Sequence, residues 1–195
     1  MPRISFSRCW LGALSSILWL SLSACDDSLG LPNPAFANRV DTITLYALNG
    51  TPIRLPSAYD VVTASDSRTE RGDPFDFAFN IDENGTALIL PPGAMGGAFP
   101  KLAGVLLSDE EFESIRSAPL EEYVADSAIA IAESSVFVVQ SRPERTPDCL
   151  FLGALPRYGK FRVLALNPTE RSVTLELLVD INCGYRGLEP GFPAS

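Results

Sequence analysis

The carboxylates are the only side chains in this sequence that are grouped closely enough to suggest acid/base chemistry. Seven of them lie within positions 60–83: Asp60, Asp66, Glu70, Asp73, Asp76, Asp82 and Glu83. Two carboxylates can hydrolyse a glycosidic bond at the correct separation, but spacing along a β-rich chain does not set that separation. A solvated acidic surface is the simpler interpretation. We therefore predict no catalytic residue.

Other reactions are limited by the residues that the sequence lacks. The chain contains no histidine, which excludes Ser-His-Asp and Cys-His catalysis and histidine metal ligands. Its two lysines, Lys101 and Lys160, are outside any Ser-x-x-Lys motif. Gly93-Ala94-Met95-Gly96-Gly97 lacks the lysine and the strand-to-helix context of a phosphate-binding loop. We predict a protein that is not an enzyme and needs no cofactor.

One short motif has the spacing of the first ligands of a calcium-binding loop. In Asn80-x-Asp82-x-Asn84-Gly85 the first three ligand positions are correct, but the twelfth position is Pro91 instead of the bidentate glutamate. Asn84-Gly85 is also the dipeptide that best fits a two-residue hairpin turn. We therefore predict a turn here and no metal site.

The overall charge limits the partners of this protein. The net charge is −9 at neutral pH, from 15 basic and 24 acidic residues. An acidic domain repels phosphate groups, and the sequence has no basic patch with interleaved aromatic residues. We therefore expect no nucleic-acid partner and no broad contact between the protein surface and anionic lipid.

The N-terminal segment has the order of an export signal. Arg3 and Arg8 precede an apolar run from Cys9 to Ala24, which ends in the small pair Ser23-Ala24. The run of 16 residues is interrupted by four serines and is shorter than the roughly 20 residues that a membrane span requires. Ordinary secretory cleavage and a retained helix are two possible outcomes for such a segment.

The end of this run, Leu22-Ser23-Ala24-Cys25, resembles the lipobox of bacterial lipoproteins. The resemblance implies that the signal peptide, residues 1–24, is removed and that Cys25 is lipidated. Acylated Cys25 would then hold the protein on the lipid bilayer, since two or three acyl chains give stable anchoring. The implied location is the bacterial cell envelope, on the inner or the outer membrane.

The residues after Cys25 are predicted to connect the anchor to one folded domain. Asp26 and Asp27 resemble the inner-membrane retention signal of enterobacterial lipoproteins. Residues 25–40 are rich in proline and lack sustained periodicity, so we expect a tether. Residues 41–195 are enough for a single β-rich globular domain.

Cysteine usage agrees with export. Cys9 would be discarded and Cys25 lipidated, which leaves the pair Cys149 and Cys183 in an oxidising compartment. We predict a disulfide between them, with two buried thiols as the alternative.

The hydrophobic pattern is mainly that of β-strands separated by turns. Period-two alternation or continuous apolar runs predict the following strands: 41–48, 53–55, 75–81, 88–90, 127–132, 136–141, 161–166 and 172–181. Val136-Phe137-Val138-Val139 indicates burial on both faces. The predicted fold is an antiparallel β-sandwich or a partly open barrel with one short helix.

Three local details follow from the same pattern. Ser108 with Glu111 forms a capping box, so we expect the short helix to begin there and end before Pro119. Asn49-Gly50 is expected to turn the first strand back into 53–55. In the hairpin around Asn84-Gly85, we expect Ile81 to face Leu88 and Phe79 to face Leu90.

The Asn-Gly-Thr sequence occurs in both of these predicted turns. Asn49-Gly50-Thr51 and Asn84-Gly85-Thr86 begin two eight-residue segments that also share leucine and proline at equivalent places. The pattern does not return a third time, so we expect two similar hairpins and no solenoid or propeller.

The C-terminal segment from Asn182 to Gly191 resembles the ends of other exported bacterial proteins that have no assigned activity. The expected function is therefore a membrane-anchored envelope lipoprotein with a non-catalytic binding or structural role, whose partner is an envelope protein or a glycan. The alternatives are a carboxylate-dependent enzyme that acts on envelope glycans and an accessory subunit of an export or assembly machine.

Overall fold

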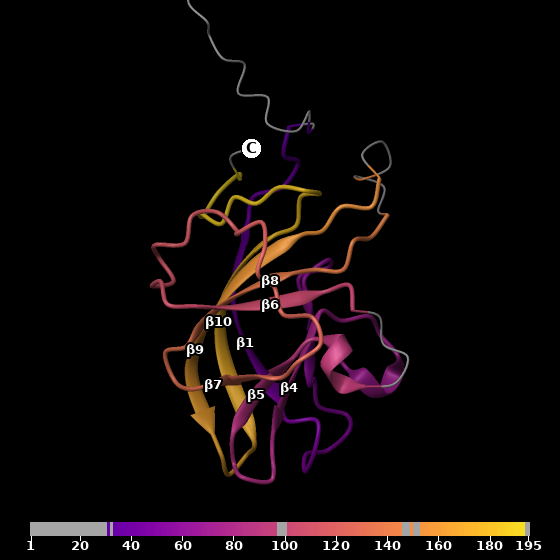
Figure 1. The fold of residues 1–195 in the computed structure, drawn as a ribbon, viewed down its shortest axis with the longest axis vertical. Coiled ribbons are helices and arrows are strands. Elements are labelled where there is room, and N and C mark those ends of the chain that lie inside the picture. Colours follow the sequence, from indigo (N-terminus) through magenta and orange to yellow (C-terminus); the bar gives the residue numbers. More distant parts are fainter. Residues whose placement is uncertain (1–30, 32, 97–100, 146–148, 150–152, 194–195) are drawn as a thin grey trace, which may run out of the picture.

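The fold is a sandwich of two five-stranded antiparallel sheets (Figure 1). The computed structural model describes residues 31, 33–96, 101–145, 149 and 153–193. The first sheet has the order β1 (Arg39–Tyr46), β10 (Ser172–Asp180), β9 (Tyr158–Asn167), β8 (Val136–Gln140) and β6 (Gly104–Ser108). The second has the order β3 (Ser65–Ser67), β2 (Ala58–Asp60), β4 (Phe77–Ile81), β5 (Ala87–Leu90) and β7 (Ile129–Ile131). The predicted mainly β, single-domain fold is confirmed.

The main core lies between the sheets and is built by alternation along the strands. On β10, Val173, Leu175, Leu177 and Val179 are all fully buried. Because neighbouring residues of a strand point to opposite faces, these four residues share the inner face. Aromatic rings fill the centre of this core: the ring centroid of Phe161 lies 5.0 Å from that of Phe77 and 5.2 Å from that of Phe137, and Phe77 is 5.6 Å from Phe137.

A second, smaller core covers the outer face of the first sheet. Val136 and Val138 of β8 pack there against Phe112, Ile115 and other residues, while Phe137 and Val139 face the main core. The predicted burial of β8 on both faces is therefore confirmed.

The covering segment is not the predicted helix, although Phe112 and Ile115 are buried as expected. Residues 109–118 form turns, and the short helices of the described residues are η1 (Thr69–Arg71) and η2 (Pro92–Met95). The buried Nζ of Lys160 on β9 donates to the carbonyls of Phe112 and Ile115, at 2.7 and 2.9 Å. These two carbonyls accept hydrogen bonds from a side chain instead of from backbone N–H groups of a helix. The capping box at Ser108 and Glu111 is therefore followed by a turn and not by a helix.

The β4–β5 hairpin exists, but its predicted register is wrong by one residue. Ile81 pairs with Ala87 and Phe79 with Ile89. The loop is wider than Asn84-Gly85 because Asp82 accepts hydrogen bonds from two backbone N–H groups within it. The shift places Ile89, which is fully buried, on the core face.

The predicted hairpin at Asn49-Gly50 is also wrong. β1 pairs with β10, from Arg39 opposite Val179 to Tyr46 opposite Ser172, and residues 53–55 form turns. Pairing all eight residues of β1 with β10, which also buries Leu45 in the main core, outweighs a local return strand bounded by two prolines.

The two ends of β1 lie at opposite ends of the molecule (Figure 1). At its start, Asn182 holds the incoming chain: its Oδ1 accepts from the backbone N–H of Ala35 and Phe36, and its Nδ2 donates to the carbonyl of Phe36. The turns β4–β5 and β9–β10 lie at the other end. Eight strand residues separate the two ends by about 26 Å.

Candidate functional site

The seven grouped carboxylates do not form one site. Two of them, Asp60 and Asp76, are buried together, and Asp82 and Glu83 line a hollow elsewhere on the surface. Asp66 and Glu70 are exposed, and Asp73 lies beside Arg71 at 3.6 Å.

The buried pair is joined by Arg142, which follows β8 of the other sheet. Nη1 of Arg142 lies 3.0 Å from Oδ1 of Asp60 and 3.1 Å from Oδ1 of Asp76. Asp76 also accepts from the backbone N–H of Arg142 and Val61, and Asp60 from the N–H of Val62 and the hydroxyl of Thr63. All four carboxylate oxygens therefore have protein donors.

The electrostatics of this pair fit a structural role. Burial raises the pKa of Asp76 to about 6, and the charge of Arg142 and the two N–H donors oppose that rise. A general acid needs an oxygen that faces its substrate, whereas these oxygens face protein donors. We call Asp60, Asp76 and Arg142 the inter-sheet clasp.

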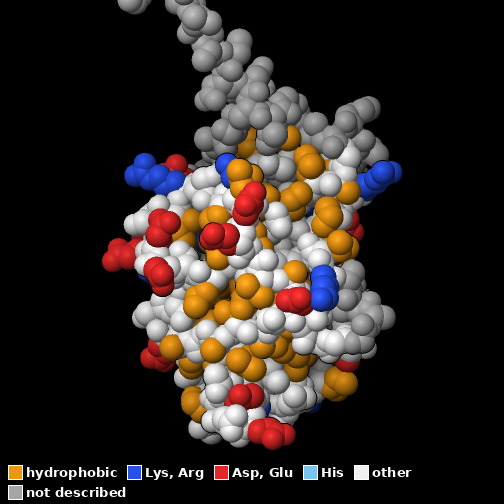
Figure 2. Space-filling model, in the orientation of Figure 1, with side chains coloured by type: hydrophobic (Ala, Val, Ile, Leu, Met, Phe, Trp, Pro, Cys, Tyr) orange, Lys and Arg blue, Asp and Glu red, His pale blue; other side chains and the backbone are white. Residues whose placement is uncertain are grey.

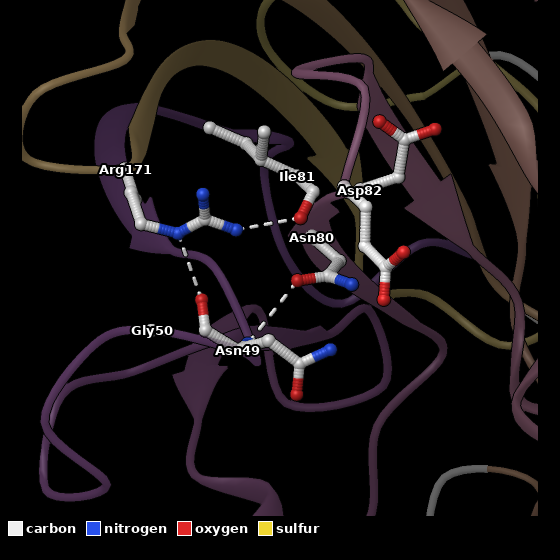
Figure 3. A pocket seen from close by; sticks show the side chains of 7 residues that line it. Asn49, Gly50, Asn80, Ile81, Asp82 and Arg171 are labelled. Atoms are coloured by element: carbon white, nitrogen blue, oxygen red, sulfur yellow. Dashed lines mark hydrogen bonds between the residues drawn. The ribbon is translucent and has the colours of Figure 1, made fainter.

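A hollow of about 590 Å³ lies beyond the end of β1 that is remote from Asn182 (Figure 3). We call it the distal recess. It is lined by Asn49, Gly50, Asn80, Ile81, Asp82, Glu83 and Arg171. These residues come from the segment after β1, the end of β4 and its turn, and the start of β10. Both sheets therefore contribute to the recess.

Arg171 bridges the two sides of the recess. Its Nε donates to the carbonyl of Asn49 at 2.9 Å and its Nη2 to the carbonyl of Ile81 at 2.6 Å, as Figure 3 shows. Its backbone is in the left-handed region, with φ of 53°. Asn167 stabilises the preceding turn by accepting the N–H of Thr169 and Glu170.

Gly50 makes room for this arginine. Its φ is 82°, and a Cβ at this position would lie 2.8 Å from Nε of Arg171. Glycine is therefore required both by the backbone conformation and by the close approach of the guanidinium.

Asp82 stabilises the β4–β5 turn, which explains the calcium-like spacing of the motif. Its Oδ1 accepts from the N–H of Asn84 at 2.9 Å and of Thr86 at 2.7 Å. The hydrogen bond from Thr86 is the main reason that the pKa of Asp82 lies below its usual value. No group of three or more acidic, cysteine or histidine side chains that could hold a metal ion occurs among the described residues. The two hydrogen bonds to Asp82 make the motif a side-chain-capped turn, and a turn was the structure predicted here.

Several polar atoms of the recess are free to bind a ligand. Within the described part of the chain, no hydrogen-bond partner is found for Nη1 of Arg171, Nδ2 of Asn80, or the side chains of Asn49 and Glu83. The recess therefore offers both donors and acceptors.

The cysteine pair forms the predicted disulfide. Cys149 and Cys183 are bonded, with Cα atoms 5.7 Å apart, and both are buried. The bridge lies beside Asn182, which holds Ala35 and Phe36, so it braces the end at which the chain enters the sandwich. Cys25, the predicted lipidation site, lies outside the described residues.

The sequence analysis did not single out Asn49, Asn80 or Arg171 as site residues. The repeated Asn-Gly-Thr was the available signal, because its two copies flank the recess: the N–H of Leu48 donates to the carbonyl of Phe79, and that of Asn49 to Oδ1 of Asn80. No sequence pattern pointed to Arg171, because its hydrogen-bond partners are more than 80 residues away along the chain.

None of the helices in the described ranges is long and apolar enough to cross a membrane. Comparisons with protein-family models, with curated proteins and with solved structures find no match.

Proposed function

We propose that this protein is a lipid-anchored lipoprotein of the bacterial cell envelope with a non-catalytic binding role. The observation that carries the proposal is the position of the distal recess relative to the incoming chain. Asn182 holds Ala35 and Phe36 at one end of the sandwich, and the recess lies about 26 Å away at the other end of β1. A domain anchored through Cys25 would carry its recess on the side away from the lipid.

The chemistry of the acidic residues supports binding over catalysis. The oxygens of Asp60 and Asp76 are occupied by protein donors, and Asp82 uses one oxygen to cap its own turn. A binding role needs none of the residue types that the chain lacks.

The open edge of β1 gives less support to an assembly subunit. An unpaired edge strand can accept a strand from a partner. Here Oδ1 of Asp41 accepts the N–H of Thr42, and Oδ2 pairs with Arg39 at 2.9 Å. A charged side chain that bonds to a backbone N–H group of an edge strand opposes the addition of another strand there.

Anchoring is tested by fractionation and mass spectrometry of the wild-type protein and two variants. Cys25→Ser should move the protein from the membrane to the soluble fraction, because the thioether can no longer form. Cys9→Ser changes a cysteine of the same apolar run outside the lipobox, so it should leave the protein on the membrane.

The mass of the wild-type protein is the second measurement. We expect a chain that begins at acylated Cys25 and lacks residues 1–24. A Cys25→Ser protein that still pellets with membranes, or a wild-type chain without acyl groups, would show that the proposal is wrong.

A further inference from the structure

The distal recess is lined by charged groups of both signs. Arg171 lines it together with Asp82 and Glu83, and the side-chain amides of Asn49 and Asn80 complete its polar wall. We propose that the recess binds hydroxyl groups of a neutral saccharide. This inference specifies the binding role proposed above and rests on it.

The guanidinium of Arg171 is held in position before any ligand binds. Its two bonds, to the carbonyls of Asn49 and Ile81, anchor it to both sides of the recess (Figure 3). The planar group is then rigid, so Nη1 can donate to a ligand with little further loss of side-chain entropy.

Other polar side chains of the recess are also held in position by hydrogen bonds within the protein. Asp82 is fixed by its turn, because its Oδ1 accepts the N–H groups of Asn84 and Thr86. Asn80 is fixed through Oδ1, which accepts the N–H of Asn49, and its Nδ2 remains as a donor. Glu83 adds an exposed carboxylate beside Asp82.

This mixture of charges selects against simple ions. A phosphate or a free carboxylate would meet the two acidic side chains, and a metal cation would meet Arg171. A sugar hydroxyl carries no net charge, and it accepts from a guanidinium while donating to a carboxylate. The hydroxyl groups of one saccharide can therefore pair both with Arg171 and with Glu83.

The size and surroundings of the recess agree with such a ligand. Its volume of about 590 Å³ is within the usual range for small-molecule sites. The molecule is acidic overall, and acidic side chains occur at the lower end of the face seen in Figure 2. A negatively charged polymer would be repelled from this end, whereas a neutral glycan would not.

The test is NMR titration of the soluble Cys25→Ser protein with cellobiose, maltose and N,N′-diacetylchitobiose. We expect at least one disaccharide to shift the backbone amide signals of Gly50, Asp82 and Glu83. Inorganic phosphate and Ca²⁺ should not shift these signals, because each carries a net charge that some of the recess groups oppose. Glycylglycine, whose ammonium and carboxylate could pair with the same groups, tests whether the recess instead takes a zwitterionic ligand.

Two variants report on the recess without loosening it. The side chains of Asn49 and Glu83 have no protein hydrogen bond among the described residues, so Asn49→Ala and Glu83→Ala should fold normally and weaken binding about tenfold. Asn33→Ala and Glu110→Ala change the same residue types at exposed positions outside the recess lining and should bind as the parent does.

The proposal is overturned if no disaccharide shifts the recess signals, if the shifts lie elsewhere, or if glycylglycine, phosphate or Ca²⁺ binds there instead. Anchoring is read from the membrane fraction and saccharide binding from the soluble protein. Either proposal can therefore fail while the other stands.

Discussion

The Nη1 atom of Arg142 lies 3.1 Å from Oδ1 of Asp76, whose carboxylate is completely buried. Arg142 follows a strand of the first sheet and Asp76 precedes a strand of the second, so this ion pair joins the two layers of the sandwich. Asp60 shares the same guanidinium nitrogen at 3.0 Å. Two acidic residues that suggested chemistry in the sequence thus stabilise the fold.

Arg142→Met should lower the free energy of unfolding by about 3–5 kcal/mol, because it leaves buried carboxylates without their counter-charge. Urea unfolding of the Cys25→Ser protein measures this loss. The matched control is Arg39→Met, which removes an exposed pair with Asp41 and should cost less than about 1 kcal/mol. Equal losses for the two variants would contradict the clasp.

Asp180 should make the protein less stable as the pH rises from about 4 to about 6. Burial raises the pKa of Asp180 to about 6, although two hydrogen bonds from Asn182 oppose the rise. The folded protein therefore keeps a proton that the unfolded chain releases near pH 4, and the associated stability, about 3 kcal/mol, is lost above the folded pKa.

The measurement is the stability of the parent minus that of Asp180→Asn across this pH range. We expect the difference to fall with rising pH. Asp126→Asn is the opposite control: Lys101 lowers the pKa of Asp126, so the parent's advantage should grow as the pH rises through its acidic range. A flat difference for Asp180→Asn would contradict the prediction.

Lys160→Met should loosen residues 109–118, which cover the outer face of the first sheet. The substitution leaves the carbonyls of Phe112 and Ile115 without their donor, at a cost of about 1–3 kcal/mol for each buried acceptor. Hydrogen exchange of that segment should become faster. Lys101→Met, which removes the exposed pair with Asp126, should leave the exchange of 109–118 unchanged.

Reduction of the Cys149–Cys183 disulfide should destabilise the protein by about 3–4 kcal/mol, because the bond closes a loop of 34 residues in the unfolded chain. Urea unfolding with and without reductant measures the effect. A Cys149→Ala/Cys183→Ala protein should be destabilised without reductant and insensitive to it. Alkylation of both cysteines in the untreated wild-type protein would disprove the bond.

Local patterns predicted much of this fold because they reflect local physics. Alternation along β10 identified the four residues of its buried face, and the continuous run in β8 indicated burial on two sides. The pairing of Cys149 with Cys183 was predicted from the number of cysteines that would remain if the chain were exported and lipidated.

The predictions that failed depend on contacts between distant residues. Ser108 and Glu111 favour a helix locally, but Lys160, which is distant in the sequence, donates hydrogen bonds to carbonyls of the same segment. Asn49-Gly50 favours a hairpin, but β1 pairs with β10, which is over 120 residues away in the chain.

The sequence alone determined the strand content, the cysteine pair and the acidic character of this protein, because composition and short-range periodicity act within a few residues. Tertiary structure decided which acidic residues meet. It buried Asp60 and Asp76 against Arg142 and placed Asp82 and Glu83 beside Arg171. The reason is physical: a carboxylate's role depends on the charge and burial around it, and chain packing brings those neighbours from remote positions.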